Sequence, residues 1–411
     1  MTPNSATCDT GLPLSEVLAC IASHPALTAA ALNLETATAI GHDAGKRGPD
    51  ELFLGTENIG GDLPGYSDAE TTLTWRRPIV ETARARAARK SAAQARKAMI
   101  FETERIAWRL SIDAQVAFHK ALGLRDLTVT AGELVVLTEE LARAARERVN
   151  VGVAPENEAI KADMELTRAR TEQRHVIAEF AQAKIALGRA IGRPFGAERP
   201  LVGTLTPDLA LPDRNVLLKG LLERHPVFRE ENLALEENAV GKEKLRAEQR
   251  PELAFETGIR NLRADRKMTF VMGVTASLPN HSASTGALTA LSLQRKRIEL
   301  ESGTARLTLE AELDEWIARF AAARETALDL RDRILPAARN VFSLAMDGYR
   351  LGKTDQLSAL EARKSLLETQ RELQHALDDL YQSASEIERM CGICLVGEAH
   401  ESTRASKSNE Y

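Results

Sequence analysis

The sequence predicts a mainly α-helical fold with a small β part, in which a unit of helix, β-hairpin and long helical hairpin occurs twice. Three observations lead to this prediction. Charged residues make up 27% of the 411 residues and aromatic residues only 4%, a composition typical of long helices and coiled coils. Each half of the chain contains one pair of short β-type segments. Matching residues recur 200 positions apart, as in the pairs Ala145/Ala345, Gly152/Gly352, Ala159/Ala359 and His175/His375.

In the first half, apolar residues at helical spacing predict a helix over 14–48, which ends at Gly48-Pro49. Two strands over 51–58 and 70–77 follow, separated by a loop rich in glycine and ended by Pro78, and they predict a β-hairpin over 51–77. No proline interrupts 81–150, so we expect one helix of about 105 Å there. The chain then turns at Gly152 and Pro155 and returns as a helix to about residue 191.

The second half repeats this order. A β-hairpin is expected over 253–278, with strands at 253–260 and 268–278, followed by a helix over 284–350, a turn at Gly352 and a returning helix to about residue 390. The returning helix has two sets of apolar residues at a spacing of seven, which is typical of coiled coils. These sets are Leu366, Leu373, Leu380 and Ile387, and Leu377, Ala384 and Cys391.

The predicted organisation has two repeats and three flanking or connecting segments. The first repeat covers 14–192 and the second covers 214–392. A connector rich in proline and glycine lies between them at 193–213. We expect the N-terminal segment 1–13 and the polar tail 393–411 to be disordered.

Four strands are too few to close a barrel alone, because small barrels need about eight, and open strand edges call for pairing with another chain. In the last strand, Phe270, Met272 and Val274 share one face and Thr269, Thr275 and Ser277 the other. This alternation favours one face toward lipid and one toward water. A soluble, half-buried hairpin fits the same pattern. The alanine-rich helices similarly fit either a closed tube of helices or a soluble coiled-coil rod.

Several classes of function are disfavoured. The net charge of −5 gives no reason to expect nucleic acid as a partner. We expect no enzyme activity and no cofactor, since phosphate-binding loops and nucleophile motifs do not appear. The histidine spacing does not support a metal site, and the pair Cys391/Cys394 is interpreted as a helix end rather than a redox or metal motif. No unbroken run of 18 apolar residues predicts a transmembrane helix, and no signal peptide pattern is apparent at the N-terminus.

The ordered part of the chain, about 14–392, resembles the TolC-type outer membrane efflux proteins, and within them the cobalt-zinc-cadmium resistance branch. The order, spacing and duplication of several short stretches carry this resemblance. They are His24-Pro25 and His225-Pro226, Glu57-Asn58-Ile59-Gly60-Gly61, Ala69-Glu70-Thr71-Thr72-Leu73-Thr74, Pro78-Ile79, Ser277-Leu278-Pro279, and Tyr349-Arg350-Leu351-Gly352 with Leu360-Glu361-Ala362. The chain departs from the family pattern at Val80–Arg84, which lacks the usual glycines, at 280–286, and at Val149, where the second repeat has Tyr349.

The resemblance implies a homotrimer with a twelve-stranded β-barrel in the outer membrane lipid and a twelve-helix α-barrel in the periplasm. It implies a passive conduit for heavy-metal cations, with a periplasmic adaptor (membrane fusion) protein and an inner-membrane pump of the resistance-nodulation-division type as partners. Two alternatives stay open. The first is an outer membrane channel for drug efflux or type I secretion, and the second is a soluble helical scaffold.

The same resemblance nominates the two turns as the adaptor-docking tips. The residues concerned are Val151, Gly152 and Val153 in the first repeat, and Leu351, Gly352 and Lys353 in the second. A simpler interpretation is that any tight turn between helices favours glycine. Tyr349 and Glu361 occupy positions of a periplasmic gate in the family, with a solvated helix face as the alternative.

Overall fold

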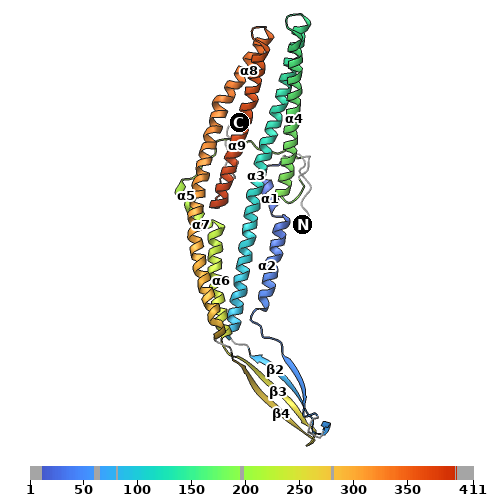
Figure 1. Ribbon diagram of the computed structural model, residues 1–411, viewed down its shortest axis with the longest axis vertical. Coiled ribbons are helices and arrows are strands. Elements are labelled where there is room, and N and C mark those ends of the chain that lie inside the picture. The colour runs from blue at the N-terminus through green and yellow to red at the C-terminus, as the bar shows by residue number, and fades with distance from the viewer. Residues whose placement is uncertain are drawn as a thin grey trace, which may run out of the picture. The chain divides into compact units, whose positions relative to one another are not determined.

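The computed structural model describes residues 12–59, 65–79, 82–194, 199–278, 282–393 and 395 (Figure 1). Among the residues singled out above, Gly60, Gly61, Val80, Pro279 and Cys394 lie outside these ranges. Nearly all of the N-terminal segment 1–13 and of the tail 393–411 also lies outside them. The expected disorder of these two segments therefore stays a prediction.

The first half of the chain contains four α-helices, one short 3-10 helix and two strands among its described residues. In chain order they are α1 (Leu14–Ile21), α2 (Pro25–Asp43), β1 (Glu51–Glu57), the short 3-10 helix η1 (Gly65–Asp68), β2 (Glu70–Ile79), α3 (Thr82–Asn150) and α4 (Glu156–Ala190). The second half contains α5 (Arg214–Arg224), α6 (Pro226–Glu248), β3 (Glu252–Leu262), β4 (Lys267–Ser277), α7 (Ser282–Asp329), the π-helical segment η2 (Leu330–Ile334), α8 (Leu335–Arg350) and α9 (Gln356–Cys391). The predicted mainly α fold with a small β part is confirmed.

The chain forms two compact units, and each draws residues from both halves of the sequence. Unit 1 comprises Met1–Ala29, Glu104–Pro226 and Arg306–Tyr411, and unit 2 comprises Ala30–Thr103 and Val227–Ala305. The long helices α3 and α7 contribute residues to both units. The repeats are therefore units of sequence, whereas each compact unit needs both repeats to form its core.

In unit 2 the four strands form one antiparallel sheet in the order β1-β2-β3-β4. The central pairing of β2 with β3 joins the two repeats, with Thr74 opposite Gly258. At Gly258 a Cβ would come within 2.2 Å of the carbonyl oxygen of Leu73, so only glycine fits this close strand pairing. The chain enters and leaves the sheet at one end, and both hairpin turns lie at the other.

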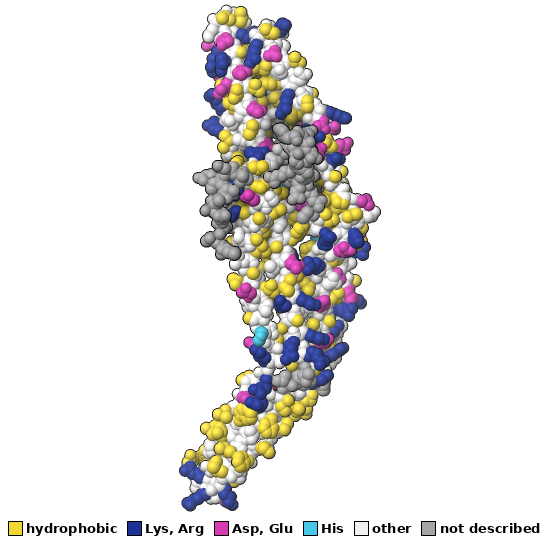
Figure 2. All heavy atoms as spheres, turned by 180° about the vertical axis from the view of Figure 1, so that it is seen from behind, with side chains coloured by type: hydrophobic (Ala, Val, Ile, Leu, Met, Phe, Trp, Pro, Cys, Tyr) yellow, Lys and Arg dark blue, Asp and Glu magenta, His cyan; other side chains and the backbone are white. Residues whose placement is uncertain are grey.

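The register places most apolar side chains on one face of this sheet and most polar side chains on the other, with Phe53 as an exception on the polar face. The apolar face is solvent-exposed, and Phe270, Met272 and Leu52 are exposed by 89%, 75% and 73% (Figure 2). The polar face carries ion pairs between neighbouring strands, including Arg76 with Glu51 and Arg260 with Glu70. This is the division into a lipid-facing and a wet side that the alternation predicts.

One predicted helix is two helices in the structure. The expected helix over 14–48 is broken between Ile21 and Pro25, and its second part ends at Asp43, where Gly45 has a φ of 72°. The break follows from Pro25, which has no N–H to donate within a helix and is favoured as the first residue of a new one. Pro226 begins α6 in the same way in the second repeat.

By length and composition, the stretch Leu14–Asp43 is apolar enough to cross a membrane, which the search for an unbroken apolar run did not predict. In the structure, however, α1 buries Leu14, Val17 and Ile21 in the core of unit 1. The counterparts of this stretch in the second repeat, α5 and α6, are rich in charged residues. α1 is therefore a packing helix of unit 1, whereas α2 buries only Ala30.

A second difference lies in the helix expected over 284–350. It is interrupted by the wider turn of η2, immediately before Pro336. Proline lacks an N–H, and its ring clashes with the carbonyl group of residue i−4 in a regular α-helix. A π-helical turn removes that conflict while the helix continues.

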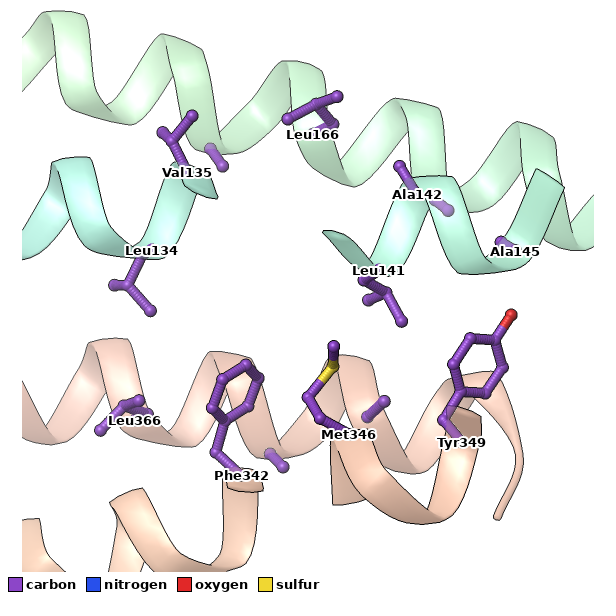
Figure 3. Packing of buried hydrophobic residues seen from close by; sticks show 14 of the residues in the cluster. Leu134, Val135, Leu141, Ala142, Ala145, Leu166, Phe342, Met346, Tyr349 and Leu366 are labelled. Carbon is purple, nitrogen blue, oxygen red and sulfur yellow. The ribbon is translucent and has the colours of Figure 1, made fainter. Parts of the chain in front are cut away.

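The core of unit 1 around the two turns is built from α3, α4, α8 and α9 (Figure 3). Side chains of α8, including Phe342 and Met346, face Leu134 and Leu141 of α3. Within α9 the predicted seven-residue spacing follows the buried face, since Leu366, Leu380, Ile387, Leu377, Ala384 and Cys391 are buried and Leu373 is half-buried. The face of α9 that this spacing predicts to be buried is thereby confirmed.

Candidate functional site at the two helix turns

Both turns between long helices have the same backbone geometry. Gly152 and Gly352 have φ values of 75° and 70°, in the left-handed region that glycine favours. The N–H of Gly152 donates to the carbonyl oxygen of Val149 at 3.0 Å, and the N–H of Val153 donates to that of Arg148 at 3.0 Å. The equivalent bonds of Gly352 and Lys353 are 3.0 and 2.8 Å long. This is the Schellman motif, which ends a helix by satisfying its last carbonyl groups.

The residues around these glycines point outward. Val151, Leu351 and Val153 are exposed by 73%, 68% and 64%, and Lys353 is also exposed. A Cβ built on Gly152 meets no heavy atom within 4 Å, and one on Gly352 lies 3.3 Å from the guanidinium group of Arg148. Each turn is thus a small exposed surface, and the space above Gly152 is open whereas that above Gly352 is bordered by Arg148. The six nominated docking residues are accessible to a partner.

Beneath the turns, Tyr349 joins the two helical hairpins. It is completely buried, and its hydroxyl donates a hydrogen bond of 3.2 Å to Glu158 Oε2 on α4. The guanidinium group of Arg148 lies over the Tyr349 ring and donates a hydrogen bond to its backbone oxygen at 3.3 Å. Gln356 Nε2 donates to the backbone oxygen of Glu158 at 2.6 Å. Residues of all four helices therefore fix the turns against each other.

The two residues nominated for a gate have different surroundings. Burial, reinforced by the neighbouring Glu158 carboxylate, raises the pKa of Tyr349 to about 12, so its hydroxyl stays protonated as a hydrogen-bond donor. Glu361, on α9, is exposed. The alternative of a solvated helix face applies to Glu361 but not to Tyr349.

Sequence reasoning missed a buried ionic cluster formed by the same four-helix core. Arg363 of α9 is only 8% exposed, and it donates hydrogen bonds of 3.0 Å to Thr138 on α3 and of 3.0 Å to Glu165 on α4. Burial lowers the pKa of Arg363. A signal for this cluster was present, because the series Leu377, Ala384, Cys391 extends backwards in steps of seven through Gln370 to Arg363. Polar residues at buried heptad positions indicate buried polar contacts.

A half-buried acid, Asp378, lies further along α9. Burial raises the pKa of Asp378 to about 6, although Gln374 Nε2 donates a hydrogen bond of 2.9 Å to it. The folded protein consequently binds more protons than the unfolded chain between about pH 4 and pH 6, so stability falls as the pH rises through this window.

Replacing Asp378 by asparagine is therefore expected to raise the free energy of unfolding above pH 6 by about 2 kcal/mol, and to flatten its decline between pH 4 and pH 6. Asparagine keeps an oxygen that accepts from Gln374 and cannot ionise. The measurement is the unfolding midpoint of both proteins across this pH range. If the unfolding midpoints of the two proteins depended on pH in the same way, the raised pKa of Asp378 would be contradicted.

Among the residues that the structure describes, no group of three or more His, Cys, Asp or Glu side chains is placed to hold a metal ion. Cys391 is the last residue of α9, and burial raises the pKa of its thiol to about 11.

The fold is that of outer membrane channel proteins. The structure superimposes on the outer-membrane channel OprN with a TM-score of 0.75 and 18% identity, covering 92% of this chain and 89% of that one. It superimposes on the outer membrane protein VceC of Vibrio cholerae with a TM-score of 0.72 and 17% identity, covering 92% of this chain and 96% of that one.

Sequence comparison agrees with this fold. Residues 217–393 match the model of the outer membrane efflux protein family, and the resemblance inferred from the sequence is confirmed. Over 261 residues the chain is 30% identical to the cobalt-zinc-cadmium resistance protein CzcC of Cupriavidus metallidurans. The aligned region covers 61% of this chain and 60% of that relative.

Proposed function

We propose that this chain is the outer-membrane channel subunit of a tripartite efflux system that exports heavy-metal cations. The observation that carries the proposal is the 30% identity to a cobalt-zinc-cadmium resistance protein, together with the channel fold. The chain is a passive conduit and performs no chemistry on its cargo. It resides in the outer membrane and extends into the periplasm.

The exposed apolar face of the sheet supports a membrane position for β1 to β4. The sheet has two edge strands, β1 and β4, whose outer edges pair with no other strand among the described residues. Three copies of a four-stranded sheet, joined edge to edge, make a twelve-stranded barrel without free edges. In this homotrimer the long helices of the three subunits form the periplasmic α-barrel.

The two turns are the proposed contact with a periplasmic adaptor protein, which links the channel to an inner-membrane pump of the resistance-nodulation-division type. Exposed apolar side chains such as Val151 and Leu351 offer the burial that such a contact needs. The open space above Gly152 allows close approach of a partner helix. In this proposal Tyr349 and Glu361 belong to the periplasmic end of the channel, where Tyr349 holds the two hairpins together.

The test is complementation. Cells that lack the gene are expected to become sensitive to zinc, cobalt and cadmium, and the full-length protein is expected to restore tolerance at least tenfold in metal concentration, as a detergent-stable trimer in the outer-membrane fraction. Deletion is expected to cause sensitivity because the pump remains but its exit path across the outer membrane is lost. Unchanged metal tolerance accompanied by altered drug tolerance would instead support a drug channel. A monomer in the soluble fraction would overturn the channel proposal altogether.

A further inference from the structure

The hairpin turn between β3 and β4 carries a cluster of positive charge. The turn consists of Arg263–Arg266, and Lys267 begins β4. All five residues from 263 to 267 are exposed, and three of them are cations against the single acid Asp265. Figure 2 shows Lys and Arg side chains at the free end of the sheet, next to the hydrophobic side chains of the strands.

The backbone at Arg266 is one that arginine does not favour. Its φ is 52°, and its N–H donates to the carbonyl oxygen of Arg263 at 3.3 Å. Glycine or asparagine suits such a position, and Asn58 is the other non-glycine residue with positive φ in the described part of the chain. The turn geometry therefore does not call for arginine at position 266.

Arg263 is held in place by the neighbouring hairpin. Its N–H donates to the carbonyl oxygen of Ala69 at 3.3 Å, and its guanidinium group lies 4.3 Å from the ring centroid of the exposed Tyr66. Arg260 lies three residues earlier, within β3, and differs in that its guanidinium group is paired with the Glu70 carboxylate at 3.2 Å. An arginine stacked on a tyrosine keeps its N–H groups available in one orientation.

The basic turn adjoins the apolar face of the sheet. Met268 and Phe270, exposed by 67% and 89%, follow Lys267 on β4. All four strands meet their helices at the opposite end of the sheet. If the sheet spans the outer membrane, as proposed above, the turn therefore lies at the level of the outer-leaflet headgroups. Clusters of Lys and Arg at this level attract anionic lipids.

We propose that Arg263, Arg266 and Lys267 bind the phosphate groups of an outer-leaflet lipid headgroup. Guanidinium groups bind phosphate oxygens in pairs of parallel hydrogen bonds, and the ammonium group of Lys267 adds a point charge. The inference rests on the proposed function, because it requires the sheet to lie in the outer membrane. The bound lipid fixes the depth of the barrel in the outer leaflet.

The test uses the full-length protein reconstituted in phosphatidylcholine nanodiscs that contain either diphosphorylated or dephosphorylated lipid A. Native mass spectrometry measures the lipid A retained per protein. Arg266→Asn and Arg263→Gln are each expected to weaken retention of the diphosphorylated lipid about fivefold, and removal of all three cations about a hundredfold. Asp265→Asn is expected to strengthen it severalfold, and Arg266→Lys to leave it within about twofold.

Arg266→Asn separates binding from folding, because asparagine suits the left-handed backbone and is expected to keep or raise the melting temperature. Equal retention by wild type and charge-removing variants, or equal retention of the two lipids, overturns the inference. Competition by inorganic phosphate at concentrations comparable to the lipid also overturns it, in favour of a simple anion site. A protein that fails to insert into the nanodiscs would instead contradict the proposed function.

Discussion

Replacing Glu165 by leucine is expected to lower the free energy of unfolding by about 3–5 kcal/mol, because the substitution leaves the charge of Arg363 buried without its carboxylate. Arg363 is 8% exposed, and after the substitution the hydroxyl of Thr138 remains as its hydrogen-bond acceptor. The partners come from α3, α4 and α9, so the loss is expected to loosen both hairpins together. Hydrogen exchange of the amides in these helices measures the effect locally.

The double variant Glu165→Leu with Arg363→Met is expected to recover most of this loss, since an apolar pair of similar volume avoids the desolvation cost of two charges. A matched control is Glu299→Leu, which breaks the exposed pair with Arg295 (61% and 50% exposed) and is expected to change stability by less than about 0.5 kcal/mol. If the double variant were as unstable as the single one, packing rather than the unpaired charge would be the cause.

Tryptophan at either turn glycine is expected to abolish metal tolerance in the complemented cells while leaving the trimer intact. At Gly152 the new side chain has open space, so the cost to folding is confined to the left-handed backbone, about 1–2 kcal/mol. The loss of tolerance follows from blocking the approach of the adaptor. The measurements are growth in zinc, cobalt and cadmium and the mobility of the detergent-solubilised protein.

The control is Gly152→Asn, because asparagine adopts the left-handed conformation readily and adds a small side chain. It is expected to retain most of the tolerance. Loss of the trimer in the tryptophan variant would mean that the glycine serves the chain reversal alone. Full tolerance with tryptophan at both turns would place the adaptor contact elsewhere.

The features that the sequence predicted correctly are those with a local pattern. Alternation along β4 identified its apolar face, because successive side chains of any strand point to opposite sides. Spacing of seven identified Leu366, Leu380 and Ile387 as the buried face of α9. The prediction of helix boundaries did not use two local signals, Pro25 and Pro336. Each proline marks a change in helix geometry that the apolar periodicity alone does not reveal.

The contacts beneath the turns could not be predicted in this way. Tyr349 meets Glu158 and Arg148 only after two helical hairpins, far apart in sequence, have packed on each other. Periodicity shows that a residue lies on a buried face but not which side chain of another helix lies opposite. For Arg363 the extended heptad series indicates burial, whereas its partner Glu165 follows only from the packing of α4 on α9.

The π-helical segment η2 also accommodates a shift in the seven-residue spacing of buried residues in the second repeat. Buried residues before the segment, Leu313, Phe320 and Ala327, are spaced by seven, as are Leu335, Phe342 and Tyr349 after it. Between Ala327 and Leu335 the spacing is eight. One inserted residue in a regular α-helix would rotate every later side chain by about 100°. The wide turn absorbs that rotation, so the extra step of one residue in the middle of the helix leaves Tyr349 facing the core at its end.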